Sequence, residues 1–466
     1  MHVATNFLFC AALAGSACTG FAADGALDAT FGTGGKATLA PSTLSQSLTS
    51  LVATGTAVQS DKIVIAGNDD ANDCFLARFN RDGSLDAGFY GGNGFPGGLT
   101  GYGACTYNGI AVRSDGRLVA VGNFEGATFG VVNQFSAGGA PDSGFGSYSG
   151  GTNIVPDSPN DRIYLSRVVI EANGSVDVAG TYYQQNFNGN QFFFARISAD
   201  GKTVEPFRYQ FGTGSNQDDH ANDLAIDSQG RYVVAGYHRG AYGNYDFAAI
   251  RIRNDLYDVD NTFGNAGQTT IDFGDDGDYC NTLALTRAGY IALGGQASGR
   301  AAVALLDPSG NLDQYFSGGL LYSTKFSFVY GSGAGGNDTI TQLVLDDYDT
   351  RNPQMLAIGS GFQPSASGAP YGLMFGIARL NLPMTYSNFT LDAGFSINGT
   401  EGVYFVDHPD GLGLLTTTNH GLAAALAQGE VVAAGYTAAS GGTDIAVTRL
   451  AAFDGIFKNG LETPNY

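Results

Sequence analysis

The chain has 466 residues, of which 70 are glycine and only 14% are charged, with 22 Lys+Arg against 43 Asp+Glu. Its 31 Phe and 24 Tyr provide enough apolar surface to bury a core, which excludes an intrinsically disordered chain. A net charge of −21 without any basic run excludes a nucleic-acid binder and a protein drawn to anionic lipid.

The N-terminus carries an apolar stretch from Phe7 to Ala17 that is too short to span a bilayer and is followed by small residues. This pattern predicts a signal peptide over residues 1–22, cleaved after Ala22 or the alanine that follows it. The stretch is preceded by no Lys or Arg, and a lipidated Cys18 is the alternative. No later stretch has the length and apolarity of a membrane helix. We therefore expect an exported monomer without an integral membrane segment, located in the periplasm, at the cell surface or secreted.

Three cysteines remain beyond the leader: Cys74, Cys105 and Cys280. An odd number allows one disulfide at most, and the sequence does not say which pair would form it. There is no CxxC spacing and no histidine pair four residues apart, so a zinc site is not expected.

Three short phrases recur along the rest of the chain. The first is an apolar run that ends in glycine, such as KIVIAG at 62–67 and RYVVAG at 231–236. An apolar run that is nearly continuous predicts a strand buried on both faces. The terminal glycines are 55 to 76 residues apart and are Gly67, Gly122, Gly180, Gly236, Gly295, Gly359 and Gly435.

The second phrase is an apolar strand that ends in arginine, and the third is a turn with aspartate before Phe-Gly, such as LDATFG from Leu27. The recurring arginines are Arg78, Arg196, Arg251, Arg379 and Arg449, with Gln134 and Leu305 in the same place in two further units. The recurring aspartates are Asp28, Asp86, Asp142, Asp260, Asp313 and Asp392. A residue that recurs in most units is expected to have the same structural role in each of them. We therefore expect the aspartates to cap turns and the arginines to bind carbonyls or those aspartates.

Asp-Gly and Asn-Gly pairs between the phrases, such as Asp115-Gly116, predict tight hairpins, so each unit is expected to form about four short strands. One such sheet cannot bury both of its faces, and neighbouring units must stack. We therefore predict an all-β, seven-bladed β-propeller over residues 24–455. The chain begins with the third phrase and ends with the first two, so we expect its N-terminal segment to complete the last blade and close the ring.

These phrases closely resemble the delta-60 repeat family, whose members carry DG-x-LD-x-x-FG, then A-V-x-x-DG-K-I-V-V-A-G and an Ala-Arg-Phe/Tyr strand. The resemblance covers residues 27–450 and implies a propeller-like, extracytoplasmic protein with no assigned activity. Residues 456–466 form a C-terminal tail that begins IFKNGLE and resembles the IF-x-DGFE tail of exported Gram-negative proteins. A short C-terminal strand is the alternative.

Enzyme motifs are absent from the sequence: it contains no G-x-S-x-G, H-E-x-x-H or P-loop. This favours a non-enzymatic scaffold that binds a protein or glycan partner. An extracellular hydrolase or lyase is the alternative, because two carboxylates brought together by folding are enough for glycoside hydrolysis.

Two groups of polar residues are candidates for binding. The first comprises the residues that follow the terminal glycines, where polar side chains of varied type are expected to ring one face of the propeller: Asn68, Asn123, Thr181, Tyr237, Gln296, Ser360 and Tyr436. The second comprises acidic loops at 218–223 and 272–278. Clustered carboxylates suit calcium, and the predicted ligands are Asp272, Asp275, Asp276 and Asp278.

Overall fold

The structure is a computed structural model, and it describes residues 26–39, 46–54, 62–69, 73–91, 99–102, 105–124, 126, 128–148, 150–187, 189–212, 218–240, 243–254, 258–274, 277–312, 323–326, 338–346, 354–363, 372–382, 390–392, 395, 403–406, 420–427, 430–439 and 442–450. The predicted signal peptide, Cys18, Asp275, Asp276, Asp313 and the C-terminal tail lie outside these residues.

Strands make up nearly all the regular structure of the described residues, and the single helical segment is a short 3-10 turn, η1 (Gln185–Phe187). The first strands in chain order are β1 (Lys36–Leu39), β2 (Gln46–Thr54), β3 (Lys62–Asp69), β4 (Cys74–Phe79), β5 (Leu99–Tyr102), β6 (Cys105–Val112), β7 (Leu118–Phe124), β8 (Gly130–Phe135), β9 (Gly151–Ile154), β10 (Arg162–Ile170), β11 (Val176–Gln184), β12 (Gly189–Ile197), β13 (Val204–Tyr209), β14 (His220–Ile226) and β15 (Tyr232–Arg239). The remaining strands are β16 (Tyr245–Ile252), β17 (Gln268–Ile271), β18 (Asp278–Leu285), β19 (Ile291–Ala297), β20 (Arg300–Leu306), β21 (Ser323–Phe326), β22 (Thr339–Asp346), β23 (Gln354–Gln363), β24 (Gly372–Asn381), β25 (Thr390–Leu391), β26 (Val403–Val406), β27 (His420–Ala427), β28 (Glu430–Ala439) and β29 (Gly442–Leu450).

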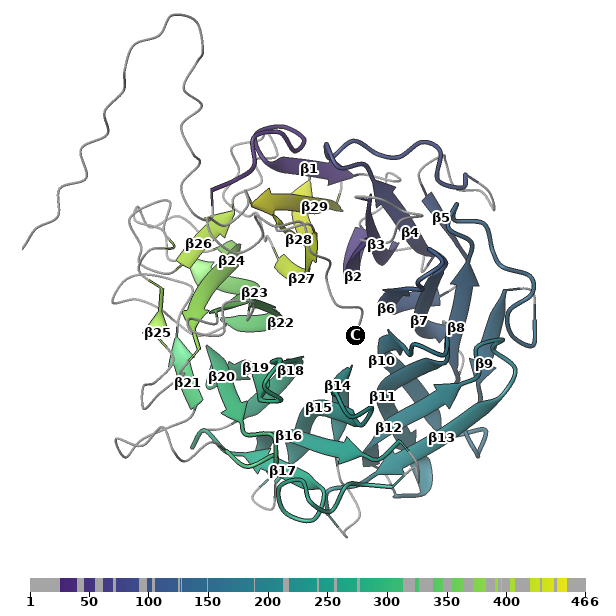
Figure 1. Cartoon of the computed structure of the whole chain (residues 1–466), viewed down its shortest axis with the longest axis vertical. Helices are drawn as coiled ribbons and strands as arrows, with labels where there is room; N and C mark the ends of the chain where they lie inside the picture. The colour runs from purple at the N-terminus through teal and green to yellow at the C-terminus, as the bar shows by residue number, and fades with distance from the viewer. Residues whose placement is uncertain are drawn as a thin grey trace, which may run out of the picture.

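These strands form antiparallel sheets arranged around a common centre, with the first strand of each sheet innermost (Figure 1). We name each sheet after that strand. The sheets are β2–β5, β6–β9, β10–β13, β14–β17, β18–β21, β22–β25 with β26 on β24, and β27–β29 with β1. The predicted all-β propeller arrangement is therefore confirmed. In the β27 sheet, β1 is the outermost strand and pairs with β29, so that Lys36 faces Thr448 and Leu39 faces Ile445.

The recurring terminal glycine lies opposite an irregularity in the innermost strand. In the β14 sheet the register between β14 and β15 shifts between Ala221 and Asp223, which leaves Asn222 as the extra residue of a bulge. A Cβ on Gly236 would lie 1.8 Å from the carbonyl oxygen of His220. The innermost strand therefore approaches the second strand too closely for any side chain at this place, and only glycine fits.

The core consists of hydrophobic clusters that each lie between two neighbouring sheets. Ile65 and Phe75 of the β2 sheet, for example, pack with Val432 and Val447 of the β27 sheet. Comparable clusters join the other neighbouring sheets. Both faces of the second and third strands are thereby buried, as their nearly continuous apolar runs predict.

One disulfide joins two neighbouring sheets. Cys74 begins β4 and Cys105 begins β6, and the two are bonded, whereas Cys280 is a free, buried thiol. The pair that the cysteine count left open is therefore the one between the β2 and β6 sheets.

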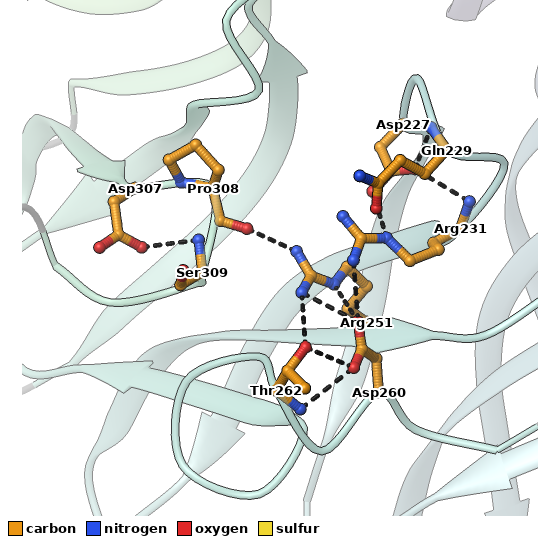
Figure 2. Close-up of polar contacts among 9 residues, drawn as sticks. All are labelled: Asp227, Gln229, Arg231, Arg251, Asp260, Thr262, Asp307, Pro308 and Ser309. Atoms are coloured by element: carbon orange, nitrogen blue, oxygen red, sulfur yellow. Dashed lines mark hydrogen bonds and ion pairs between the residues drawn. The ribbon is translucent and has the colours of Figure 1, made fainter.

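Recurring arginines join several sheets to their neighbours. Arg251 pairs through Nη2 with Asp260 Oδ2 at 2.9 Å, and its Nη1 donates to the carbonyl oxygen of Pro308 in the β18 sheet at 2.6 Å (Figure 2). Its guanidinium also lies over the ring of Phe263, 4.7 Å from the ring centroid. Asp260 Oδ1 in turn accepts from the Thr262 amide, which caps the turn.

The same arrangement recurs in other sheets. The aspartate partners are Asp86 for Arg78, Asp392 for Arg379 and Asp28 for Arg449, and the rings beneath the guanidinium groups are Phe89, Phe395 and Phe31. The next-sheet carbonyls are those of Ala137 for Arg78 and Arg81 for Arg449.

Three units depart from this pattern, and one of them is the β18 sheet, where Leu305 stands in place of the arginine. In the other two, different side chains fill the place of the missing partner. In the β6 sheet Gln134 replaces the arginine and donates to Asp142, while Arg113 takes the position over the ring of Phe145 and donates to the carbonyl oxygen of Ala199. In the β10 sheet the aspartate phrase is missing. There, Arg196 pairs with carboxylates of its own sheet, Glu171 and Asp177.

Asp177 gives the protein a pH-dependent stability. Its side chain is fully buried, and Oδ2 has no hydrogen-bond partner. Burial, followed by repulsion from Glu171, raises the pKa of Asp177 above its usual value, although Arg196 opposes this shift. The folded state therefore holds this proton more tightly than the unfolded state, whose aspartate titrates near pH 3.9. This stabilisation is complete below about pH 4 and is lost as the pH rises through the higher folded pKa.

We expect the free energy of unfolding of the wild type to fall above about pH 4 by up to about 1.4 kcal/mol per pH unit through this one group. Asp177→Asn should flatten that slope, as measured by denaturant unfolding between pH 4 and pH 8. Asp115→Asn is the control, because Asp115 is half exposed and paired with Arg117. Equal slopes in the wild type and Asp177→Asn would contradict this prediction.

Candidate functional site

The seven residues that follow the terminal glycines occupy the same rung of their respective sheets. Each faces a residue of the innermost strand: Asn68 faces Ser47, Asn123 faces Thr106, Thr181 faces Tyr164, Tyr237 faces His220, Gln296 faces Tyr279, Ser360 faces Thr339 and Tyr436 faces His420. They therefore lie on the second strand of each sheet, one strand away from the centre.

This rung does not present seven equivalent side chains. Thr181 and Ser360 are buried. Asn123 donates through Nδ2 to the carbonyl oxygen of Ile163 in the neighbouring β10 sheet. At these three positions the side chain faces other parts of the protein. Of the remaining positions, Tyr237 and Gln296 lie in the neighbouring β14 and β18 sheets.

Polar side chains from the innermost strands meet near the common centre of the sheets. Arg167 of β10 places Nε 2.9 Å from Asp223 Oδ1 of β14, and its Nη1 lies 3.5 Å from Gln342 Oε1 of β22. Asp223 Oδ2 accepts from the hydroxyl of Thr282 at 2.9 Å. These contacts link strands that lie on different sides of the centre in Figure 1. The network is structural, since Asp223 is buried and each of its oxygens has a partner.

A cluster of aromatic rings lies at the rung of the β14 and β18 sheets. Tyr237 of β15 stacks on His220 of β14, with 4.7 Å between ring centroids. Tyr279 of β18 and Tyr245 of β16 both meet Tyr237 edge to face, at 5.1 and 5.4 Å, and pack on each other at 5.1 Å. All four rings are half-buried. We call these four residues together with Asp218 the tyrosine cluster.

Asp218 is the acidic member of the tyrosine cluster. Its carboxylate accepts from Tyr245 Oη and Asn190 Nδ2, and lies 2.8 Å from His220 Nε2. Burial works against ionisation of Asp218, but the hydrogen bonds from Tyr245, Asn190 and His220 hold its pKa below the usual value. The cluster therefore contains a carboxylate that is ionised at neutral pH.

The two tyrosines nearest Asp218 remain neutral. Burial, followed by the charge of Asp218, raises the pKa of Tyr237 to about 12. The hydrogen bond to Asp218, together with burial, raises the pKa of Tyr245 to about 12. The cluster therefore offers neutral phenols and aromatic faces around one negative charge, a combination that suits hydroxyl-bearing or cationic ligands.

The rest of the acidic loop at 218–223 is bound to the protein itself. Asp219 is fully buried, lies 2.7 Å from His238 Nδ1 through Oδ1, and accepts the Phe211 amide through Oδ2. With Asp223 in the central network, neither carboxylate is available to an incoming ligand.

The second predicted loop contributes two of its four aspartates to a group of three carboxylates. Asp272 and Asp278 join Asp246, which the sequence did not suggest, and the three offer oxygen atoms within 4.8 Å of one another. Asp275 and Asp276 lie outside the described residues. Asp246 was missed because it precedes Asp272 by 26 residues and reaches it only through the pairing of Phe247 with Ile271.

Comparison with known families gives one short match. A family model described as a domain of unknown function (DUF5122) beta-propeller matches residues 59–89. This match supports a β-propeller repeat, and the delta-60 resemblance stays a prediction. No curated protein matches the chain.

Comparison with solved structures finds several distant similarities. One comes from a study of two prolyl endopeptidases, with 11% identity, a TM-score of 0.39 and coverage of 84% of this chain and 47% of that one, so the chain spans about half its length. A protein of unknown function from Dyadobacter fermentans has 12% identity and a TM-score of 0.38 over 90% of this chain and 98% of that one. An alpha-L-arabinofuranosidase from Fusarium graminearum has 10% identity and a TM-score of 0.38 over 73% and 92%. At these values the similarities carry no argument about activity.

The described residues contain no helix with the length and apolarity of a membrane span.

Proposed function

We propose that the chain is an exported, non-enzymatic binding protein, built as a closed propeller of seven sheets, that holds a glycan at the tyrosine cluster. The observation that carries this proposal is the cluster itself, in which four half-buried rings surround one ionised carboxylate. Ligand sites combine aromatic faces with a few placed polar groups, and a sugar offers C–H faces for the rings and hydroxyls for the phenols. The cluster consists of five residues from two neighbouring sheets, whereas a protein partner usually contacts about 20–30 residues on each side of an interface.

Three observations support closure of the ring. β1 pairs with β29 and thereby adds the N-terminal segment to the β27 sheet. A hydrophobic cluster joins the β2 and β27 sheets. Arg449 donates across the same junction to the carbonyl oxygen of Arg81.

Export is supported by the predicted leader at 1–22 and by the Cys74–Cys105 disulfide, since disulfides persist mainly in oxidising compartments.

An extracellular carboxylate-dependent hydrolase or lyase is the second candidate function. It is favoured by the approach of Asp246, Asp272 and Asp278 to within 4.8 Å, because retaining glycosidases use two carboxyl groups about 5–5.5 Å apart. Release of new reducing ends from a bound glycan would decide for this candidate.

The test is a glycan array with the mature protein, followed by calorimetric titration of the best glycan. We expect Tyr237→Ala to weaken binding about 10-fold or more, because it removes the ring that contacts the other three (about 1.4 kcal/mol). Tyr245→Phe should cost less, because it keeps the ring and removes only the hydroxyl that binds Asp218.

Tyr164→Ala is the matched control. Tyr164 faces the same rung from the β10 sheet, is 43% exposed, and lies outside the cluster. The Tyr164→Ala variant should bind the glycan with the affinity of the wild type. Unchanged binding by Tyr237→Ala would overturn the assignment of the site, and capture of a protein rather than any glycan would overturn the ligand class.

A further inference from the structure

The three carboxylates beside the tyrosine cluster come from separate segments of two sheets. Asp246 is the second residue of β16, Asp272 directly follows β17, and Asp278 is the first residue of β18. Phe247 and Ile271 are paired neighbours, so Asp246 and Asp272 leave their strands side by side. Asp278 belongs to the next sheet, and the group therefore lies at the junction of the β14 and β18 sheets.

Two buried oxygens in this group lack a hydrogen-bond donor. Asp278 has no exposed surface, and while its Oδ2 accepts the Phe273 amide at 2.7 Å, its Oδ1 is buried without a partner. Oδ1 of Asp246 is buried without a partner as well. Within the described part of the chain, no arginine or lysine forms an ion pair with either carboxylate or with Asp272. Burying charged oxygens without a donor destabilises the folded state. We therefore expect these two oxygens to bind a partner that the protein itself does not supply.

The electrostatics of the group are unfavourable as it stands. Burial raises the pKa of Asp278 to about 6, and repulsion from Asp246 and Asp272 adds to that shift against the Phe273 amide. Burial, followed by the charge of Asp272, also raises the pKa of Asp246, with His238 opposing. A bound divalent cation would replace this repulsion with attraction.

The geometry suits calcium better than the other common cations. Calcium binds oxygens at about 2.3–2.6 Å, so two of its ligands can be up to about 5 Å apart, and the three carboxylates lie within that limit. The group contains no histidine or cysteine, the ligands that zinc sites favour. One oxygen of Asp272 accepts the Gly274 amide at 2.6 Å, which leaves its second oxygen for a cation.

We propose that Asp246, Asp272 and Asp278 bind one Ca²⁺ ion, which joins the outer strands of the β14 sheet to the first strand of the β18 sheet. Asp246 and Asp278 supply oxygens that have no other partner, and Asp272 supplies its free oxygen from the solvent side. This proposal does not depend on the nature of the ligand at the tyrosine cluster.

The test uses the mature protein freed of metal with a chelator. Addition of CaCl₂ should raise the melting temperature of the wild type by several degrees, because the ion binds the folded state alone. The double variant Asp246→Asn/Asp278→Asn should differ from the wild type both without metal and with CaCl₂. Without metal it should melt at or above the wild-type temperature, because the repulsion is gone, and it should gain nothing from CaCl₂. A merely destabilised variant would melt lower in both conditions.

A second measurement reports the site directly. Tb³⁺ replaces Ca²⁺ at oxygen sites. Tyr245 and Tyr279 can sensitise its emission, because each is next to a proposed ligand in the sequence. The chain contains no tryptophan, so the aromatic excitation comes from tyrosine. We expect tyrosine-excited Tb³⁺ emission that CaCl₂ reverses, and a loss of most of this emission in the double variant. Asp157→Asn, which changes a 70% exposed carboxylate elsewhere, should keep both responses. The proposal is overturned by a wild type that does not respond to millimolar CaCl₂, or by equal responses in the wild type and the double variant.

Discussion

Removal of residues 24–39 is expected to lower the melting temperature by at least about 10 °C, because it takes away contacts with two sheets at once. Within the β27 sheet the deletion removes β1 and its pairing with β29. Toward the β2 sheet it removes Phe31, which is fully buried in the shared hydrophobic cluster, and the bond from the Gly32 amide to the carbonyl oxygen of Asp82.

The deletion also leaves a buried charge behind. Arg449 is 3% exposed and pairs with Asp28 at 2.6 Å, so the deletion leaves it with the more distant Glu430, 3.4 Å from its Nε, as a charged partner. Breaking a buried ion pair from one side costs about 3–5 kcal/mol, and truncating a buried phenylalanine costs about as much. Because whole domains are stable by only about 5–15 kcal/mol, the loss of both approaches the total.

Differential scanning calorimetry measures this effect, and a peptide of residues 24–39 added in excess provides the control. The peptide should restore part of the lost stability, since its contacts are local to the junction. Melting that is unchanged by the deletion would show that β1 contributes nothing to the junction, and would argue for an open array of sheets.

The strands of the fold could be predicted from the sequence because each repeated phrase has a local physical meaning. The run RYVVAG is apolar on both faces, and it forms a strand buried between two sheets. The recurring glycine could be recognised in the sequence as well, but the structural reason why glycine is required there could not. Gly236 is required because the β14 backbone bulges toward it at Ala221 to Asp223, and a bulge in a partner strand leaves no mark in the glycine's own phrase.

The candidate site was harder to predict because it depends on which residues the register brings together. Tyr237 could be found, since it follows a terminal glycine. Tyr245 and Tyr279 join it from β16 and β18, and nothing in their own sequence context distinguishes them from the other tyrosines. Conversely, the acidic run at 218–223 looked available to a ligand. The fold turns Asp219 toward His238 and Asp223 toward Arg167, as only the packing between sheets can show.

The repeated arginine explains how neighbouring sheets are joined, and Arg251 is a deeply buried example, with 3% of its surface exposed. We expect Arg251→Ala to lower the free energy of unfolding by about 3–5 kcal/mol, measured by denaturant titration. The substitution leaves Asp260, itself 6% exposed, with only Arg231 as a charged partner, 3.1 Å away. It also removes the donor to Pro308 of the next sheet and the cation over the ring of Phe263 (Figure 2).

Arg231→Ala is the matched control for this prediction, since it removes a second arginine from the same aspartate. Arg231 is partly exposed and pairs with Asp227 and Asp260 of its own sheet, without reaching the β18 sheet. Its loss should cost about 1 kcal/mol or less. Adding Asp260→Asn to Arg251→Ala should recover part of the loss, because the neutral amide keeps the turn-capping oxygen and removes the unpaired charge. If Arg251→Ala costs no more than Arg231→Ala, the contact between sheets is not what makes this arginine recur, and its pairing within the sheet is enough to explain the repeat.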